Sequence, residues 1–383
     1  MINHSFFSAP FRPFFLFGSL IGILFPMYWV GILVNDYAFP DSFIAPIDWH
    51  AFEMIFGFTT AILTGFILTA SAHWTNKPMM SKGPLVLLFF FWVLERTLFL
   101  IPNIPAALLL FAHLPFFSLL LAHLYKKFMD DPPKLFSFGL IFTFLFIFKY
   151  LFLLGIYYDM PNFVSYSKEI SLNLITMIIV LVTGKIFPFF TSKACPEITI
   201  TKRPYIEMAA KLIVLFIIFT PLLPQPGLVQ AILFLLAGAL HILRWLNWHP
   251  LKTRKVILLF SLHIGYLWMI VYFLLKGLGH FISPLNFSAA ALHSFTMGTL
   301  GVLILSIMTR VALGHSGRPL KVNQSFYWAL ILVNLGALIR VLMPIALADY
   351  YLESLHYAMG SWTLGYIVYL VGTAPILWKP SLA

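Results

Sequence analysis

The chain has 383 residues, of which 61% are hydrophobic and only 10% are charged. Soluble domains carry roughly 45–50% apolar and about 25% charged residues, so lipid must be the solvent for much of this surface. The net charge of +11 does not indicate nucleic acid, because the cations occur in short loops between apolar runs. The single cysteine, Cys195, excludes a disulfide framework, a four-cysteine zinc site and an ordinary four-cysteine iron–sulfur cluster. Composition therefore predicts an integral membrane protein with no nucleic-acid partner.

A bilayer needs about 20 apolar residues for each helix that crosses it. Runs between proline, glycine and charged residues predict an all-α, polytopic bundle of about twelve transmembrane helices. The expected spans are 14–34, 49–73, 83–101, 104–125, 136–157, 168–190, 206–222, 226–246, 255–276, 286–313, 325–346 and 351–377. No linker is long enough for a soluble domain, so 1–383 is expected to be a single integral membrane domain. No cleaved signal is expected, because only Arg12 precedes a full-length first apolar span.

Lysine and arginine distinguish two sets of loops. One set carries Lys77, Lys82, Lys126, Lys127, Lys134, Lys193, Lys202, Arg203, Lys252, Arg254, Lys255, Arg318 and Lys321. The other set has little beyond Lys168 and Lys276 and is acidic at positions such as Asp41 and Asp159. The positive-inside rule therefore places both termini in the cytoplasm and starts each even-numbered helix at the outer face. We expect a multi-pass protein of the bacterial inner membrane.

Three cations inside the expected spans share one depth. Arg96, Lys149 and Arg340 each lie in the last third of an outward-running helix. Such side chains either snorkel to the outer head groups or hold a buried anion such as a haem propionate, which suits the planar fork of arginine. Glu53 and Glu95 lie at similar depth. They either pair with these cations or carry protons toward a reaction centre.

Twelve histidines are many for a chain with so little charge. Four of them begin even-numbered helices and are expected toward the outer face: His50, His113, His293 and His356. One such histidine is more often a packing residue, but several in one layer favour metal or haem iron as the ligand. His263 is expected nearer the midplane. Four others are expected at the cytoplasmic interface, where an amphipathic histidine is ordinary: His73, His123, His241 and His315.

Short stretches around these histidines echo one another. The sequence HAFEM at 50–54 resembles HSFTM at 293–297, and HYAM at 356–359 repeats part of it. Such echoes mark internal structural repeats or arise by chance in a chain rich in phenylalanine and methionine. A Cys-Pro pair can ligate haem, but Cys195-Pro196 lies in a basic loop, where a turn is expected.

Longer segments, in a fixed order, resemble the NnrS family. They are FRPFF at 11–15, WHAFEMIFGF at 49–58, GFILTA at 65–70, WT at 74–75, GKIFPFFT at 184–191, LHIGY at 262–266, HSFTMG at 293–298 and MTRVALGHSGR at 308–318. NnrS proteins are polytopic membrane proteins that contain haem and copper and are associated with the bacterial response to nitric oxide. The resemblance implies these properties here and makes four histidines the candidate metal ligands: His50, His263, His293 and His315.

One position departs from the family pattern. NnrS proteins usually have Trp-His-Ala-His-Glu-Met at the start of the second helix, and Phe52 replaces the second histidine here. If that histidine binds metal in relatives, this chain has lost a ligand, such as one for copper, or uses another such as His73. His73 lies about six turns farther along the helix, so it cannot fill the same coordination position.

The leading interpretation is a haem-binding inner-membrane protein that handles nitric oxide, with reduction of the gas in nitrosative-stress defence as one form of that activity. If the protein is an enzyme, it is a membrane haem oxidoreductase. Nitric oxide is small and nearly apolar, so it reaches an intramembrane iron through the lipid bilayer, and electrons would come from a membrane or quinol donor. The alternatives are a secondary transporter and a haem or metal relay or sensor without turnover.

This interpretation gives each candidate residue a role. The haem is expected to be b-type, with His50 and His293 as ligands and copper as a further metal. The propionate partners would be Arg96 and Arg340. His263 belongs to a second metal site, and the catalytic proton carriers are Glu53 and Glu95.

Overall fold

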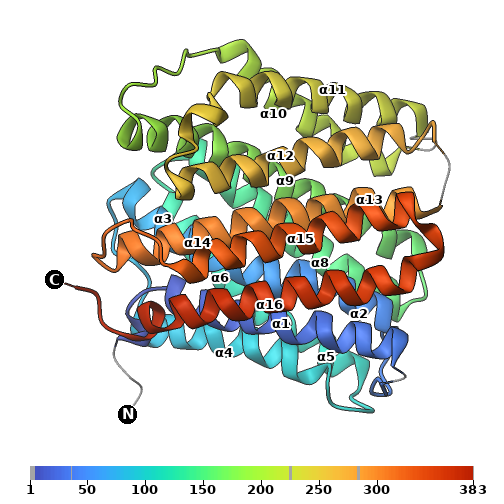
Figure 1. Ribbon diagram of the computed structural model, residues 1–383. Helices are drawn as coiled ribbons and strands as arrows, with labels where there is room; N and C mark the ends of the chain where they lie inside the picture. Colours follow the sequence, from blue (N-terminus) through green and yellow to red (C-terminus); the bar gives the residue numbers. More distant parts are fainter. Residues whose placement is uncertain (1–4, 36, 224–226, 283–284, 383) are drawn as a thin grey trace. The chain divides into compact units, whose positions relative to one another are not determined.

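The structure, a computed structural model, describes residues 5–35, 37–223, 227–282 and 285–382. Within these ranges the chain is helical and contains no strand (Figure 1). Eleven helices have at least 18 residues and are apolar enough to cross a membrane. The remaining expected span, at 83–101, is helix α4, Lys82–Leu98, with 17 residues. Every expected span therefore corresponds to a helix, although residue 226 lies outside the described ranges. The prediction of a polytopic, multi-pass helical membrane protein is confirmed.

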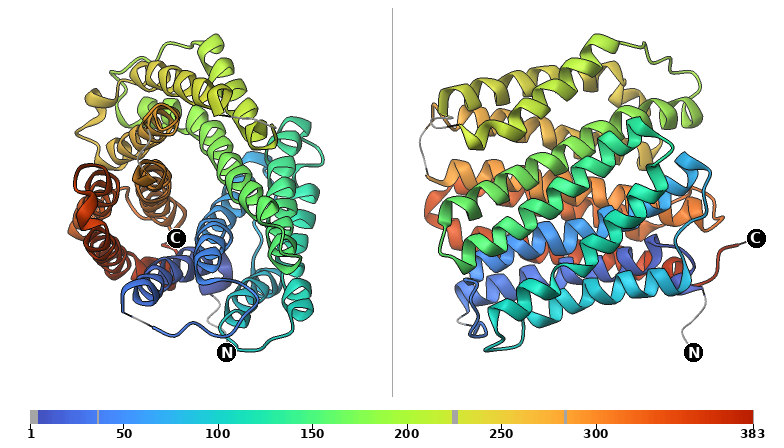
Figure 2. Two further views of the ribbon diagram at one scale, coloured as in Figure 1. Left: turned by 90° about the vertical axis from the view of Figure 1, so that its right-hand side faces the viewer. Right: turned by 180° about the vertical axis from the view of Figure 1, so that it is seen from behind.

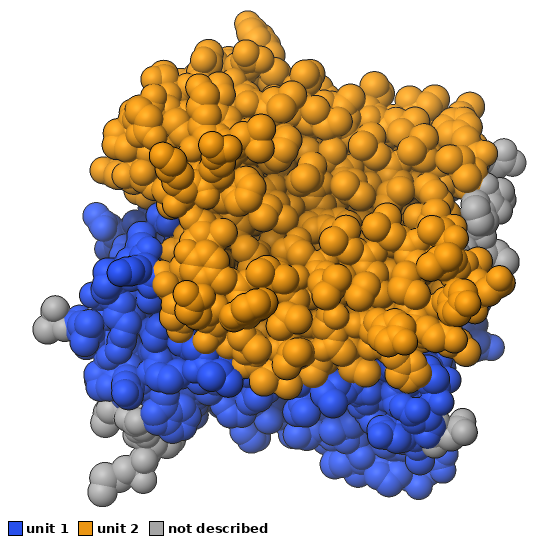
Figure 3. All heavy atoms as spheres, viewed as in Figure 1, with its two compact units in different colours: residues 1–172, 308–321, 369–383 blue, residues 173–307, 322–368 orange. Residues whose placement is uncertain are grey.

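Two compact units make up the described chain, coloured separately in Figure 3. Unit 1 comprises 1–172, 308–321 and 369–383, and unit 2 comprises 173–307 and 322–368. Three of the four unit boundaries fall inside helices: α9, Pro161–Ala194, α14, Gly301–His315, and α16, Tyr351–Trp378. The fourth, between 321 and 322, lies between α14 and α15.

Unit 1 is built from the N-terminal helices. They are α1 (Phe11–Val34), α2 (Pro46–Phe52), η2 (Glu53–Thr59), α3 (Thr60–Thr75), α4, α5 (Ala106–Ala112), α6 (Pro115–Phe128), α7 (Pro132–Lys134), η3 (Leu135–Gly139) and α8 (Leu140–Tyr157). A short 3-10 helix, η1 (Phe6–Ser8), precedes them. Asn76, with a φ of 53°, ends α3 in the left-handed conformation that asparagine tolerates.

Unit 2 is built from the later helices. They are α10 (Pro204–Phe219), η4 (Thr220–Leu222), α11 (Gly227–Asn247), η5 (Pro250–Thr253), α12 (Ile257–Leu278), α13 (Leu285–His293), η6 (Ser294–Leu300), α15 (Gln324–Ala346) and η7 (Ala348–Tyr350). In Figure 2 the yellow-green α10 and α11 run alongside one another as neighbouring helices.

Two of the long helices change to π geometry just beyond a candidate histidine. Segment η2 begins three residues after His50, and segment η6 begins one residue after His293. Each π segment has seven residues and continues without a break into α3 or α14. The two stretches that echo each other in sequence therefore also share an uncommon backbone geometry, one often found at functional sites.

The start of α1 and the C-terminal segment lie together in unit 1, at the ends marked in Figures 1 and 2. The guanidinium of Arg12, which is fully buried, donates hydrogen bonds to the carbonyl of Leu377 at 3.0 Å and to the hydroxyl of Ser381 at 3.0 Å. An even number of crossings brings both ends to one side of a membrane. Which side faces the cytoplasm stays a prediction.

Candidate functional site

Unit 1 encloses four charged side chains in one ion network. The Nε atom of Arg96 is 2.7 Å from Oε2 of Glu53, and its Nη2 is 3.1 Å from Oε2 of Glu95. The other oxygen of Glu95 accepts a hydrogen bond of 2.6 Å from Nζ of Lys149. These side chains are at most 4% exposed. Two cations and two anions therefore neutralise one another away from solvent.

Three helical segments assemble this network. Glu53 opens η2, Arg96 lies in the last turn of α4, and Lys149 lies within α8. Gly57 leaves room for it, because a Cβ atom there would collide with the carboxylate of Glu53. Since Arg96 and Lys149 are buried and paired, they do not extend to the outer head groups. The sequence left two roles open for Glu53 and Glu95: pairing with these cations or carrying protons. In the structure both glutamates are paired with them.

Phe52 packs directly against the network. Its ring centroid is 5.9 Å from Cζ of Arg96 and 6.0 Å from Nζ of Lys149. It also lies 5.5 Å from the ring centroid of His113. The position that departs from the pattern expected from the sequence thus lies beside two cations and a buried imidazole.

His113 has the hydrogen bonding of a prepared ligand. It is fully buried, and its Nδ1 is 2.7 Å from the carbonyl oxygen of Leu109. That contact makes Nδ1 the donor and leaves the lone pair on Nε2, which is buried and has no hydrogen-bond partner in the part of the chain that the structure describes. The sequence placed His113 in the outer layer without selecting it as a ligand. His50, which was selected, is half-buried and stacks on Trp29 at 5.0 Å between centroids.

Unit 2 contains a second buried polar cluster. Arg244 binds both carboxylate oxygens of Glu207, at 2.9 and 2.7 Å, and donates to the hydroxyl of Tyr266 at 3.0 Å. The same hydroxyl is 2.5 Å from Nδ1 of His241. The ring of Trp248 lies 4.8 Å from the guanidinium.

Sequence reasoning missed this cluster. His241 was expected at the interface as an amphipathic side chain, but it is fully buried. Arg244 lies in the last turn of α11, where a cation ordinarily reaches the head groups. One signal was available, because positions 241 and 244 are three residues apart and share one helix face.

His263 lies one turn before Tyr266 on α12. It is fully buried, and neither ring nitrogen has a hydrogen-bond partner within the described part of the chain. Its ring meets that of Phe187 edge-on at 4.5 Å. A buried polar group without a partner is costly, so both nitrogens favour a ligand here.

His293 and Arg340 lie at one level on packed neighbouring helices. The Nε1 atom of Trp268 donates to Oδ1 of Asn334 at 3.0 Å, and the same indole fills the space beside Gly298. Segments α13 and η6 both pack on α15. Asn334 and Gly298 therefore mark one level, that of the Trp268 indole. Arg340 lies six residues after Asn334, and His293 lies five residues before Gly298. Both therefore lie roughly 7–9 Å from this level, toward the same end of the unit.

These two side chains have different partners. The Nδ1 atom of His293 is 2.8 Å from the carbonyl oxygen of Ala289. Arg340 is 5% exposed and donates from Nη2 to the hydroxyl of Tyr351 at 3.0 Å, whereas its buried Nη1 has no hydrogen-bond partner among the residues that the structure describes. No carboxylate in the described ranges lies within ion-pair distance of Arg340.

His263 and His293 cannot share one metal ion. Phe295, two residues after His293, lies against Tyr272, with ring centroids 4.9 Å apart. Tyr272 is nine residues from His263 on the same helix, a separation of about 13 Å along the axis. The two histidines therefore belong to separate sites, if each binds a metal.

His73 and His315 meet in unit 1. The Nε2 atom of His73 is 3.1 Å from Nδ1 of His315. His73 therefore contacts another candidate ligand and does not replace a histidine at position 52, as the helix geometry predicted. In the part of the chain that the structure describes, no group of three or more His, Cys, Asp or Glu side chains could hold a metal ion.

Cys195 forms a turn, as expected. Its carbonyl accepts a hydrogen bond from the amide of Ile198 at 2.9 Å. Burial raises the pKa of the Cys195 thiol, and nearby Glu197 raises that pKa further. A thiol held in its protonated form does not favour a thiolate haem ligand.

Comparison with known proteins gives one family. The family model described as NnrS protein matches residues 5–381, essentially the whole chain and parts of both units. No curated protein matches the chain.

Proposed function

The chain belongs to the NnrS family, and from this premise we propose that it binds haem within the membrane and handles nitric oxide there. The observation that carries the proposal is Arg340, a buried guanidinium that, within the described ranges, has one hydroxyl partner and an unpaired Nη1. A buried cation without a counter-ion is unfavourable, so this position favours an anionic partner. A haem propionate supplies the anion, and the planar guanidinium suits it.

His293 supplies the second element of this site. It lies level with Arg340, and the contact of its Nδ1 with the carbonyl of Ala289 directs the lone pair to Nε2. When bound, haem supplies an iron that takes nitric oxide as a ligand and exchanges electrons. In this proposal His293 contributes the imidazole and Arg340 the propionate partner. The surrounding helices contribute a largely apolar environment that nitric oxide enters from the lipid.

Arg96 is a weaker candidate than Arg340 for a propionate partner. Its guanidinium already binds two carboxylates in a neutral, buried network. A propionate would have to displace Glu53 or Glu95 and leave that carboxylate buried without its partner, which is costly.

Reduction of nitric oxide consumes protons as well as electrons. We assign proton transfer to Glu53 and Glu95, with Lys149 as the partner of Glu95. Lys149 donates a hydrogen bond of 2.6 Å to Glu95, and a proton that shifted between these two groups would leave the net charge of the network unchanged. A carboxylate at the same depth without a cationic partner would have to take up its proton without such a neighbouring group.

His263 is proposed as a separate metal position, with copper as the candidate ion. Both its nitrogens are buried and unpartnered, and imidazole is a good copper ligand. No group of three candidate metal ligands lies together among the described residues. The remaining ligands of a copper ion at His263 would therefore come from groups other than the side chains named here.

An absorption spectrum of the purified protein, with metal analysis, tests the haem proposal. We expect a Soret band that shifts on titration with nitric oxide. A colourless, correctly folded protein would reject haem binding and favour the secondary transporter. A Soret band that does not respond to nitric oxide would keep haem and reject nitric oxide as the ligand, which leaves a relay or sensor.

A further inference from the structure

A surface pocket of unit 1, with a volume of about 320 Å³, lies where three membrane spans meet the water. The spans Pro46–Thr75 and Ala106–Phe128 end beside it, and the span Pro132–Tyr157 begins there. Two lysines and two aspartates are among the residues that line it: Lys77, Lys127, Asp130 and Asp131. We propose that this pocket binds the head group of an ethanolamine phospholipid, independent of the proposed haem function.

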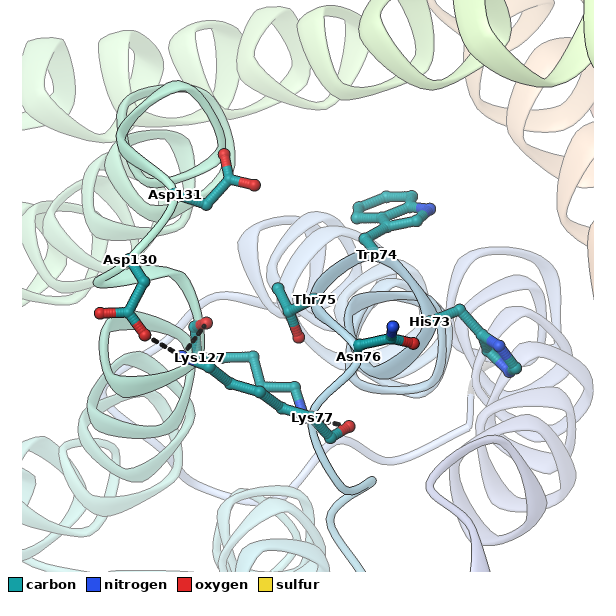
Figure 4. Close-up of a pocket in the computed structure, with 8 residues that line it drawn as sticks. All are labelled: His73, Trp74, Thr75, Asn76, Lys77, Lys127, Asp130 and Asp131. Atoms are coloured by element: carbon teal, nitrogen blue, oxygen red, sulfur yellow. Dashed lines mark hydrogen bonds and ion pairs between the residues drawn. The ribbon is translucent and has the colours of Figure 1, made fainter.

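The two lysines of the pocket hold each other in place. The Nζ atom of Lys77 donates to the carbonyl of Lys127 at 3.1 Å, and Nζ of Lys127 donates to the carbonyl of Lys77 at 2.9 Å. Figure 4 shows the two side chains alongside each other. Because both ammonium groups are already fixed, a ligand that binds them does not have to order two long side chains.

Lys127 favours an anionic ligand. It is 4% exposed, and within the described ranges its ammonium donates to the backbone carbonyls of Lys77 and Pro78 and to no carboxylate. A buried cation without a counter-ion is unfavourable. An ammonium group has three N–H donors, so one donor of Lys127 remains for a phosphate oxygen. Lys77 also keeps one donor, since its described partners are the carbonyl of Lys127 and the carboxylate of Asp130.

The acidic residues of the pocket favour an ammonium group beside that phosphate. Asp131 accepts a hydrogen bond of 3.2 Å from the amide of Lys134 and forms an ion pair with the same lysine. Asp130 has a side chain that is 79% exposed, and only its Oδ2 is paired among the described residues, at 2.8 Å from Nζ of Lys77. The Oδ1 atom of Asp130 can therefore accept a hydrogen bond from a primary ammonium. A quaternary ammonium such as choline has no N–H to donate.

The depth of the pocket favours a lipid over a free phosphate compound. Thr75 and Lys127, which lie in the last turns of α3 and α6, both line it, so the pocket is level with the lipid head groups. Trp74 also lines the pocket, and tryptophan is enriched at this level. The formal charges of the two lysines and two aspartates cancel, which suits a zwitterionic head group better than an anionic one.

The test is native mass spectrometry of the delipidated, full-length protein in detergent, titrated with phosphatidylethanolamine, phosphatidylcholine and phosphatidylglycerol of the same acyl chains. We expect one equivalent of phosphatidylethanolamine, bound about tenfold more tightly than the other two lipids. Lys77→Gln and Lys127→Gln should each weaken its binding about tenfold, the effect of losing one charge-assisted hydrogen bond. Asp130→Ala should instead abolish the preference for phosphatidylethanolamine over phosphatidylcholine, because the acceptor for the ammonium is lost.

Lys126→Gln is the matched control, because Lys126 lies in the same helical turn as Lys127 but is exposed and does not line the pocket. It should bind lipid as the wild type does. Lys77→Gln, whose native side chain is 35% exposed, decides the outcome if Lys127→Gln fails to fold.

Three results would overturn the proposal. They are equal wild-type affinity for phosphatidylethanolamine and phosphatidylcholine, unchanged lipid binding in Lys77→Gln, and binding of soluble phosphoethanolamine as tight as that of the lipid. The last result would assign the pocket to a soluble ligand. Each measurement counts bound lipid, so it does not depend on the haem proposal.

Discussion

Buried cations in this protein differ in what neutralises them. Arg96 has two carboxylates within 3.1 Å, and Arg244 has both oxygens of Glu207. Among the residues that the structure describes, Arg340 has the hydroxyl of Tyr351 as its hydrogen-bond partner and no carboxylate. At equal burial, an arginine without a carboxylate is the one that an external anion stabilises most.

Replacing Arg340 should therefore affect the cofactor. Arg340→Lys is expected to lower haem occupancy several-fold, because lysine keeps the charge but loses the planar, two-pronged donor. The ratio of Soret absorbance to protein concentration measures it. Arg96→Lys is the matched comparison: it should keep haem and instead lower the unfolding temperature, since its partners are protein carboxylates. Equal haem content in Arg340→Lys and the wild type would remove Arg340 from the site.

His293 is expected to be needed for the response to nitric oxide. His293→Ala should abolish the spectral change on titration with the gas, because the imidazole level with Arg340 is lost. His50→Ala is expected to perturb haem less, since His50 is half-buried and already stacks on Trp29. A wild-type spectral response in His293→Ala would exclude η6 and its preceding histidine from the mechanism.

At the scale of elements, the π segments set where side chains lie around the candidate sites. In η2 the segment contains both Glu53 and Gly57. The glycine allows the carboxylate of Glu53 to lie over the helix and reach Arg96. This close approach connects backbone geometry to the ion network.

Gly57→Ala should therefore destabilise unit 1. The new methyl group would force the Glu53 carboxylate away from Arg96, and breaking a buried ion pair costs about 3–5 kcal/mol. Thermal unfolding in detergent measures the effect. Gly360→Ala is the control, because a Cβ atom at Gly360 has open space around it within a helix. If both substitutions leave the unfolding temperature unchanged, the glycine has no role in positioning Glu53.

At the scale of the whole molecule, the prediction concerns orientation. Reporter fusions after Lys82, Arg203 and Arg318 should report the cytoplasm, and a fusion after Asp41 should report the periplasm, because the cationic loops stay inside. Such a pattern would also place the protein in a bacterial inner membrane. A periplasmic signal from the Arg203 loop would reverse the assignment.

The positions of the spans were determined by the sequence alone. In lipid every backbone polar group must be satisfied within the protein, and an unbroken apolar run of about 20 residues achieves this as a helix. The same reasoning applies to α4, which is 17 residues long and still matches its expected span. Family membership also followed from ordered segments of sequence, since these do not depend on tertiary contacts.

Only the tertiary structure decided which polar residues meet. Arg96 was recognised from sequence as a cation inside an expected span that either snorkels or holds a buried anion, but its pairing with Glu53 depends on how α4 packs on η2. The cluster of Arg244 and Tyr266 and the contact between His73 and His315 join helices that are far apart in the chain. Hydropathy gives the depth of such residues but not the neighbour that a helix face meets, because that depends on packing between helices rather than on transfer from water to lipid.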